Sequence, residues 1–476
     1  MKRTEIDFTT GGINKKIILF ILPIIGAYLI QQAYNSADLI FAGNRLGKTA
    51  SAAIGSSSLI VVLAIGLCGG LSVGTGILFS KAFGAKDREA QRKIGSVVLL
   101  LSIVFGGIVM VAGMLLAKPI LILMQTPQDI LDMGVGYIRI YFLSLISMML
   151  FNMTAGILRG TGNSTTPMIF QIISGGINVF LDWLFITIMP DGIIGVAWAT
   201  VISQTVAAVG TYIYFRKGDR QLWEMKEGEN EGKVDTADVP EETSAIVKKI
   251  FSLGLPVGFQ SMLVTLSNIF IQANINSMGV DGIAAFTAYF KVELFMYYPI
   301  MSLGQAALFM VGQNLGAKTT ERIRPSVAAA IKIGIPLVAA ISAVMFFFGA
   351  PVYRMFNPEP EVIGLGMDIM HVTAPLYWTY VILEVLSNAI RSYGKTKTAM
   401  LVTLILFAGA RAGLLAIYSA AGVLNIFTIA SVFPITWVVT VFTFYVIWKK
   451  LRPDGAMKNL ETPSNDDQKP HIGVKK

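Results

Sequence analysis

The chain has 476 residues, of which 54% are hydrophobic and only 14% are charged. A soluble domain carries about 25% charged residues, so this composition predicts an integral membrane protein. The net charge of +9 could suggest a nucleic-acid partner, but the basic residues fall in alternate loops, which favours topology over nucleic-acid binding. A single cysteine, Cys68, excludes an internal disulfide, and two histidines, His371 and His471, are too few for a zinc site with cysteine.

Twelve apolar stretches, each about long enough to cross a bilayer, predict an all-α protein with twelve transmembrane helices. The polar N-terminus, MKRTEIDFTTGGINKK, has no credible cleavage site after it and is interpreted as a retained cytosolic tail. In chain order the spans are expected at 17–43, 53–80, 95–117, 136–158, 167–189, 193–215, 247–278, 283–311, 327–350, 364–390, 398–419 and 423–448.

Lysines and arginines cluster at the N-terminus, in the 2–3, 6–7, 8–9 and 10–11 connections and at the C-terminus. By the positive-inside rule both termini are cytosolic, in a multi-pass protein of the inner (plasma) membrane. The expected organisation is a first six-helix lobe with its tail at 1–215, a cytosolic linker at 216–246, a second lobe at 247–450 and a disordered cytosolic tail at 451–476. We expect a monomer.

The chain repeats itself. Adding 232 to a residue number pairs Gly47 with Gly279, Gly84-Ala85-Lys86 with Gly316-Ala317-Lys318, and Arg159 and Gly162 with Arg391 and Gly394. One residue of slippage upstream pairs Pro23 with Pro256. Because each half holds an even number of spans, the two lobes are expected to be related by a pseudo-two-fold axis along the membrane normal.

Two carboxylates fall inside predicted spans of the first half, Asp38 and Asp182. Each costs about 2.5–3.5 kcal/mol in a membrane, which favours an ion path over a structural role. Asn178 lies one turn before Asp182 on the same helical face, and Asn152 and Thr200 add oxygens from neighbouring spans. Taken singly, these three could equally be interhelical contacts. Oxygen ligands suit Na⁺, bound at Asp38, Asn178 and Asp182, whereas desolvated carboxylates could carry H⁺ instead.

The second half has its own charges: Lys291, Glu293, Glu384 and Arg411. Arg411 is in the middle of a span and is expected to pair with Glu293 or Glu384. A structural salt bridge and a functional polar site remain equally open for this set. Pro23 interrupts the first span and is either a hinge or a static bend. Aromatic and polar residues lining a cavity would suit organic cations; the substrate-binding candidates are Gln31, Tyr34, Asn35 and Met296.

Taken together, these motifs resemble the MATE (multidrug and toxic compound extrusion) transporters over residues 13–450. The similarity lies in Pro23 with QQAYNSADLIFAG, FGAKD at 83–87, ILRGTGNSTTPM at 157–168, INVFLDWLFI at 177–186, GVAWATVISQ at 195–204, the stretch 291–317 and IRSYGKTKTAM at 390–400. The resemblance implies two lobes around a cavity that opens alternately to each side. It also implies export of amphipathic, often cationic compounds in exchange for Na⁺ or H⁺, with no other cofactor.

The coupling positions of family members with an acidic first-lobe site are occupied here by Asp38, Asn152, Asn178, Asp182 and Thr200. The family's bending proline corresponds to Pro23. The seventh span has no acid, which argues against a second-lobe coupling site there. The main alternative is a flippase or exporter of a lipid-linked or other endogenous solute on a related fold. A channel or a membrane-embedded enzyme is less well supported, and we expect no enzymatic activity.

Overall fold

The computed structural model describes residues 5–41, 46–189, 192–218, 220–224 and 239–451. The side chains of several residues at the end of the first helix, Asn35 and Asp38 among them, lie outside what it describes. The predicted tail at 451–476 lies outside it too, except for Leu451.

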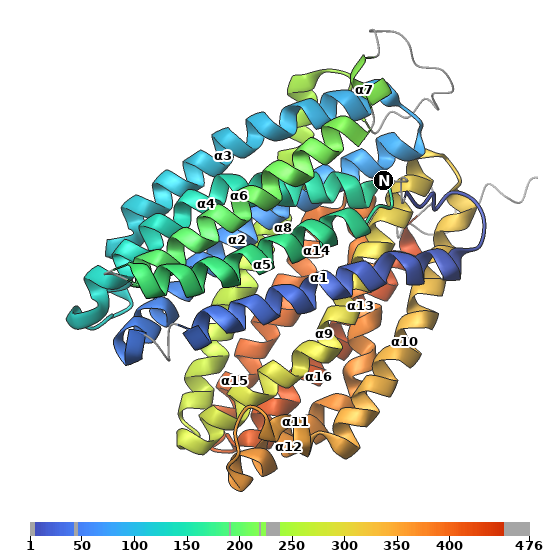
Figure 1. The fold of residues 1–476 in the computed structure, drawn as a ribbon. Helices are drawn as coiled ribbons and strands as arrows, with labels where there is room; N and C mark the ends of the chain where they lie inside the picture. The colour runs from blue at the N-terminus through green and yellow to red at the C-terminus, as the bar shows by residue number, and fades with distance from the viewer. Residues whose placement is uncertain (1–4, 42–45, 190–191, 219, 225–238, 452–476) are drawn as a thin grey trace, which may run out of the picture.

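Every described regular element is a helix (Figure 1). The first half contains α1 (Ile13–Phe41), α2 (Gly47–Gly84), α3 (Arg88–Leu123), α4 (Gln128–Gly160), α5 (Thr165–Ile188), α6 (Gly192–Gly218) and α7 (Arg220–Glu224). The second half contains α8 (Thr243–Asn276), α9 (Gly279–Gly316), η2 (Thr320–Arg322), α10 (Ile323–Phe348), α11 (Ala350–Arg354), α12 (Pro360–Thr373), η3 (Ala374–Leu376), α13 (Tyr377–Ser392), α14 (Thr396–Val402), η4 (Thr403–Gly409), α15 (Ala410–Ala420) and α16 (Ile426–Lys450).

Twelve of these helical segments are long and apolar enough to cross a membrane, which confirms the twelve predicted spans. Most helices are longer than their apolar stretches, because helical hydrogen bonding continues into the polar turns at each end. Two spans are not simple α-helices. The tenth is interrupted by the 3₁₀ turn η3, which contains Pro375, and the eleventh contains the π-helical segment η4.

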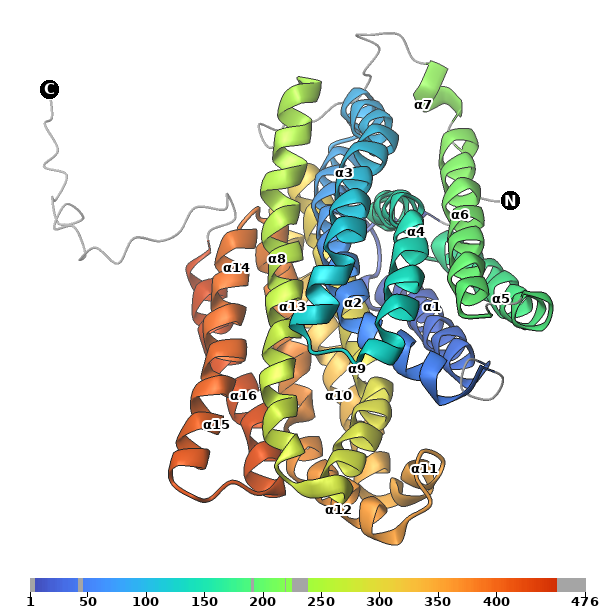
Figure 2. The same ribbon diagram turned by 90° about the vertical axis from the view of Figure 1, so that its left-hand side faces the viewer.

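The two halves occupy different parts of the molecule. Helices α1–α6 lie at the upper left of Figure 1 and most of the second half at the lower right. In Figure 2, α14–α16 lie on one side and α5 and α6 on the other, with α2, α8 and α9 between them. The predicted 216–246 linker contains α7 and the first residues of α8.

The internal repeat is visible in the backbone. Gly47 and Gly279 begin α2 and α9, which have 38 residues each, and both have positive φ angles, 83° and 79°. Gly162 and Gly394 pair at 84° and 81°, and Lys86 and Lys318 at 55° and 56°. Positive φ favours glycine and is uncommon elsewhere, so shared values at equivalent positions show that both halves use the same turns.

Glycines bring the two lobes into backbone contact along α2. A Cβ atom on Gly70 would lie 2.2 Å from the Gly258 nitrogen, and one on Gly74 would lie 2.6 Å from the Ile250 oxygen. Further along, Cβ atoms on Gly84 and Gly316 would each lie 2.0 Å from a carbonyl oxygen of the other lobe. Small residues permit such close helix packing in membranes. These contacts lie in the half of the bundle where α1 begins, the predicted cytosolic end, and form what we call the glycine seam.

The N-terminal segment, residues 5–12, packs across this end of the seam. The Phe8 nitrogen donates to Oε1 of Gln313 at 2.8 Å, and Nε2 of Gln313 donates to the Gly160 oxygen at 2.8 Å. Phe8 is 2% exposed and packs edge-on against Phe20. A guanidinium nitrogen of Arg322 donates to the Gly11 oxygen at 2.7 Å. The segment therefore links both lobes where they meet.

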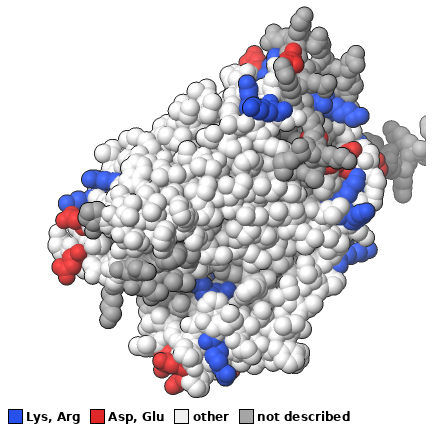
Figure 3. All heavy atoms as spheres, in the orientation of Figure 1, with Lys and Arg blue, Asp and Glu red and all other residues white. Residues whose placement is uncertain are grey.

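The surface carries large apolar side chains that would be unfavourable in water. Leu115 is 71% exposed, Phe347 70% and Phe442 68%. Figure 3 shows that on one face the charged side chains gather mainly towards opposite ends, with a broad uncharged region between them. A lipid-facing surface has this distribution, and the chain is a multi-pass membrane protein.

Candidate functional site

Helix α5 buries its polar face and exposes its apolar face. Its buried residues are Thr166, Pro167, Gln171, Ser174, Gly175, Asn178 and Asp182, which form one stripe at helical spacing. On the other side Phe180 is 57% exposed and Trp183 49%. A soluble helix has the opposite arrangement, whereas a helix in lipid turns its polar residues inward. The first lobe therefore contains a polar interior next to α5.

Tyr34 of α1 reaches into this interior. Its hydroxyl accepts hydrogen bonds from Nε2 of Gln171 on α5, at 3.2 Å, and from Nε2 of Gln204 on α6, at 3.4 Å. Gly175 makes room for it, since a Cβ there would lie 3.0 Å from the Tyr34 ring. Three helices are thus joined through one phenol, about three turns of α5 from Asp182.

Asp182 is fully buried and Asn178 is 2% exposed. Neither the oxygen nor the nitrogen of the Asn178 side chain has a hydrogen-bond partner among the described residues. An unsatisfied buried amide costs about 1–3 kcal/mol, so this position is suited to a ligand or to a residue outside the described set. The side chain of Asp38, near the C-terminal end of α1, is outside the described set.

The other two predicted coupling residues, Thr200 and Asn152, each donate a hydrogen bond within their own helix. Thr200 on α6 is buried, and its hydroxyl donates to the Val196 oxygen at 3.2 Å, which leaves its own oxygen able to accept. Asn152 on α4 is half-buried, and its Nδ2 donates to the Met148 oxygen at 2.8 Å, which leaves Oδ1 available. Among the described residues no group of three His, Cys, Asp or Glu side chains could hold a metal ion. A cation here would need amide and hydroxyl oxygens as well.

Sequence analysis did not identify Gln171 and Gln204 as part of this interior. A signal was present, because Gln171 precedes Asn178 by seven residues and lies on the same helical face. Of the substrate candidates, Tyr34 is in the site and Gln31 is half-buried on α1. Met296 is fully buried in the second lobe, where its sulfur accepts from Ser342 on α10, so it is separate from the Tyr34 cluster. Helix α1 continues unbroken through Pro23.

A polar and aromatic layer lies where the lobes meet at mid-depth. Tyr28 of α1 stacks on Tyr298 of α9, with ring centroids 5.2 Å apart, and the Tyr298 hydroxyl donates to Oε1 of Gln32 at 3.2 Å. Gln305 of α9 accepts from Arg159 of α4 at 3.1 Å and donates to the Tyr28 hydroxyl. These contacts couple the lobes through side chains that were not predicted from the sequence to meet.

The second-lobe charges do not form the expected ion pair. Among the described residues no acidic oxygen lies within salt-bridge distance of Arg411. The Arg411 guanidinium lies over the rings of Phe407 and Phe433, at 3.6 and 4.7 Å, and its Nε donates to Thr436 at 3.3 Å. Aromatic faces can stabilise a desolvated cation, which makes a carboxylate partner unnecessary. Glu293 instead accepts from the Tyr377 hydroxyl at 2.6 Å.

Glu384 and Lys291 have different surroundings from Arg411 and Glu293. Glu384 is 8% exposed and accepts from Asn388 at 2.6 Å, while the oxygen of Asn388 accepts from Arg391 at 3.1 Å. Arg391 also donates to Gln260 at 3.1 Å. Lys291 is exposed on the outside of α9. The four predicted residues of the second lobe therefore do not form one charged cluster.

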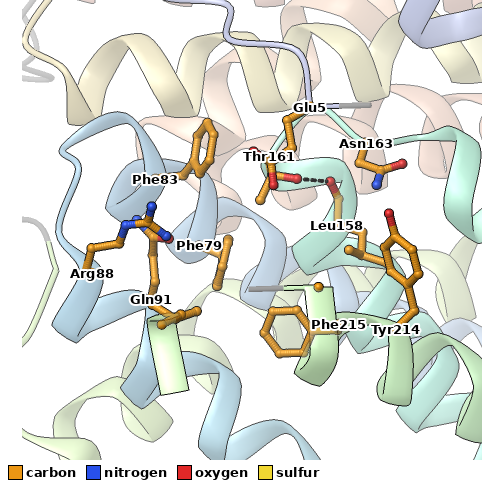
Figure 4. A pocket seen from close by; sticks show the side chains of 12 residues that line it. Glu5, Phe79, Phe83, Arg88, Gln91, Leu158, Thr161, Asn163, Tyr214 and Phe215 are labelled. Atoms are coloured by element: carbon orange, nitrogen blue, oxygen red, sulfur yellow. Dashed lines mark hydrogen bonds between the residues drawn. The ribbon is translucent and has the colours of Figure 1, made fainter. Parts of the chain in front are cut away.

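A further pocket lies at the predicted cytosolic end of the first lobe (Figure 4). Its volume is about 60 Å³, and its lining includes Phe83, Arg88, Gln91 and Tyr214, with Glu5 from the N-terminal segment. Near it the Thr161 hydroxyl donates to the Leu158 oxygen at 2.8 Å. Its lining shares no residue with the α5 stripe, so it is separate from the Tyr34 cluster.

The sequence model of the MatE family matches the chain twice, at residues 23–184 and 256–417. The chain belongs to the MATE family. The two matches begin 233 residues apart, in agreement with the internal repeat. Because MATE is a family of transporters, the all-helical fold and the polar interior of α5 belong to a membrane transport protein.

Relatives extend this similarity over most of the chain. A probable multidrug resistance protein of Bacillus subtilis, YpnP, is 28% identical over 87% of this chain and 90% of its own length. The multidrug export protein MepA of Staphylococcus haemolyticus is 24% identical over 77% of this chain and 78% of its own. The outward-facing structure of a multidrug resistance MATE transporter superimposes with a TM-score of 0.84 at 20% identity, covering 94% of this chain and 98% of that one.

Proposed function

We propose that this MATE protein is a secondary antiporter that exports amphipathic, cationic compounds in exchange for Na⁺ or H⁺. The coupling site in this proposal is Asp182 and Asn178 on α5, completed by Asp38, Asn152 and Thr200. The observation that carries it is the buried polar face of α5, where Asp182 is fully enclosed. A carboxylate is costly at that depth, and a bound cation offsets the cost.

The site can accept either ion. A carboxylate in dry surroundings favours its protonated form and so can take up H⁺. The same carboxylate, with the amide oxygen of Asn178 and the hydroxyl oxygen of Thr200, provides the oxygen ligands that Na⁺ prefers. In both cases the ion neutralises a buried negative charge. Binding or release of the ion would therefore change the free energy with which α1 packs against α5 and α6.

Alternating access would operate through the glycine seam. The lobes touch at the predicted cytosolic end, through Gly70, Gly74 and Gly84 and through the N-terminal segment at Phe8. Opening to the cytosol requires these contacts to separate while the outer half closes. A membrane potential of 100 mV supplies about 2.3 kcal/mol per charge, enough for roughly fifty-fold accumulation per ion.

Cationic substrates are supported by the tyrosines of the interlobe layer. Tyr28 and Tyr298 are stacked, and Tyr297 lies 6.2 Å from Tyr298 and 6.0 Å from Tyr380, between ring centroids. Such π faces attract organic cations. The multidrug names of YpnP and MepA support the export of drugs.

One observation favours the alternative, export of an anionic or lipid-linked solute. Arg159 and Arg391, the second 7% exposed, lie near the interlobe layer and donate to the neutral amides of Gln305 and Gln260. The Gln305 contact leaves the positive charge of Arg159 unbalanced, whereas Arg391 lies next to Glu384 through Asn388, so Arg159 is the residue that could hold an anion.

The test is efflux from vesicles. Purified protein is reconstituted into liposomes loaded with ethidium, and a Na⁺ gradient and a pH gradient are imposed separately. We expect saturable efflux with one of the two gradients and none without a gradient. Liposomes that lose ethidium at the same rate with and without the protein, under both gradients, would contradict the proposal and favour the anionic alternative.

A further inference from the structure

A groove runs along the outside of the interlobe boundary between α1 and α9. Its polar part has a volume of about 210 Å³ and is lined by Lys291, Gln32 and Ser36, together with apolar residues and Tyr298. Its apolar part, about 430 Å³, lies between α1, α9 and α10. Leu29, Phe295 and Tyr298 line both parts, so the two parts are continuous.

The polar part presents donors and no acid. Lys291 is exposed and forms no ion pair with another described residue. Gln32 uses its oxygen to accept from the Tyr298 hydroxyl at 3.2 Å, which leaves its NH₂ group free to donate. The Ser36 hydroxyl donates to the Gln32 backbone oxygen at 2.9 Å, so the donors left for a ligand are those of Lys291 and Gln32. An ammonium beside an amide NH₂ group is suited to a phosphate.

The apolar part suits a hydrocarbon chain. Except for the Tyr298 hydroxyl its lining side chains are apolar, and four of them, Ile18, Leu22, Leu29 and Phe295, are 43–58% exposed. Ile18 and Leu29 are 11 residues apart on α1, or about 16 Å along the helix axis. That length is close to one leaflet of the hydrocarbon core, about 15 Å.

We propose that this groove binds one phospholipid with an anionic headgroup. Its phosphate lies against Lys291 and Gln32, and one acyl chain lies in the apolar part between α1 and α10. A zwitterionic lipid fills the same apolar space, but its own headgroup cation competes with Lys291 for the phosphate. The site is on the outer side of α1 and α9, separate from the α5 interior, so it does not rest on the proposed transport activity.

Native mass spectrometry of the detergent-purified protein tests this site directly. We titrate phosphatidylglycerol against phosphatidylethanolamine of equal chain length and count the lipids bound. The first phosphatidylglycerol should bind about tenfold more tightly than phosphatidylethanolamine, because both lipids have an anionic phosphate but the ammonium of phosphatidylethanolamine offsets that charge and repels Lys291. Lys291→Gln should remove this preference and Lys291→Arg should keep it. Lys118→Gln, a lysine on α3 that lines neither part of the groove, is the matched control.

Two further measurements separate the headgroup from the chain. Leu22→Trp fills the apolar part and should weaken phosphatidylglycerol binding while Lys291 is intact. Glycerol phosphate, which has no acyl chain, should not bind at comparable concentration. Equal affinity of the wild-type protein for the two lipids, an unchanged preference in Lys291→Gln, no effect of Leu22→Trp, or tight binding of glycerol phosphate would each overturn the proposal. A lost preference in the Lys118→Gln control would overturn it as well.

Discussion

Helix α5 of the first lobe and its repeat in the second, α14–η4–α15, follow equivalent turns but bury side chains of opposite charge. Gly162 and Gly394 set equivalent turns before them. In α5 the buried positions are Asn178 and Asp182, whereas in the second lobe Arg411 and Leu415 are buried. Asn178 and Arg411 are 233 residues apart, and so are Asp182 and Leu415. The turn glycines, Gly162 and Gly394, are 232 residues apart.

The π-helical segment η4 explains the change of offset. A π-helix adds a residue to a turn, which rotates everything after it by about 100°. Upstream of η4, Pro167 and Ala399 are both buried at an offset of 232. Downstream, Arg411 takes the place of Asn178. The repeat therefore shows how one scaffold can hold a buried carboxylate in one lobe and a buried guanidinium in the other.

The largest expected effect comes from removing the first-lobe carboxylate. Asp182→Asn keeps the size of the side chain but removes its negative charge, so the coupling ion loses its main ligand. We expect drug resistance in cells expressing this variant to fall to the level of cells without the protein. Asp132→Asn, the same change at an exposed residue near Lys118, should retain resistance at equal membrane abundance. A resistant Asp182→Asn strain would remove the first lobe from the coupling mechanism.

The shared turns offer a second comparison. Gly394→Ala should destabilise the protein by about 1–2 kcal/mol, because alanine is strained at positive φ but its Cβ would make only an ordinary contact with Leu253, at 3.9 Å. Gly162→Ala should cost about 1–3 kcal/mol more, since its Cβ would lie 2.2 Å from the Ile6 oxygen of the N-terminal segment. Thermal unfolding in detergent measures both. Equal unfolding temperatures would mean that residues 5–12 do not hold the lobes at this turn.

The second-lobe acid should matter for stability more than for transport. Tyr377→Phe removes the donor to Glu293 and should lower stability by about 1–3 kcal/mol, because a buried acceptor loses its partner. Glu293→Gln keeps an oxygen that can accept from Tyr377, so its unfolding temperature should stay near that of the wild type. A Glu293→Gln protein that unfolds as early as Tyr377→Phe would show that the negative charge itself is needed.

The smallest effect concerns the N-terminal segment, residues 5–12. Burial alone would raise the pKa of Asp7, but hydrogen bonds from Thr9 and Thr10 and the charge of Lys16 lower it below the usual value of 3.8. The stability that Asp7 contributes is therefore present above that value and is lost as the pH falls through the lower folded pKa. Unfolding temperatures measured from pH 6 to pH 3 should fall slightly less for Asp7→Asn than for the wild type. Parallel curves would mean that the carboxylate adds no such stability.

Composition and long apolar stretches were enough to predict twelve spans, and the repeated glycines predicted the shared turns. Local sequence could not predict η4, because Thr403–Gly409 carries no proline or other break that marks a π-helix. The N-terminal segment was interpreted as a tail, since its partners Gln313 and Arg322 lie about 300 residues away in sequence. The Arg411 environment was missed for a related reason: an ion pair was expected, and two phenylalanine rings from different helices hold the cation instead.

The central claim, that ion coupling is located in the first lobe, is tested by gradient-driven efflux from liposomes containing Asp182→Asn or Glu293→Gln. Both proteins are reconstituted at equal density with whichever ion gradient drives the wild type. Ethidium efflux driven by that gradient should be absent in Asp182→Asn and remain close to wild-type in Glu293→Gln. The opposite result, coupled efflux that survives in Asp182→Asn and disappears in Glu293→Gln, would place the coupling site in the second lobe.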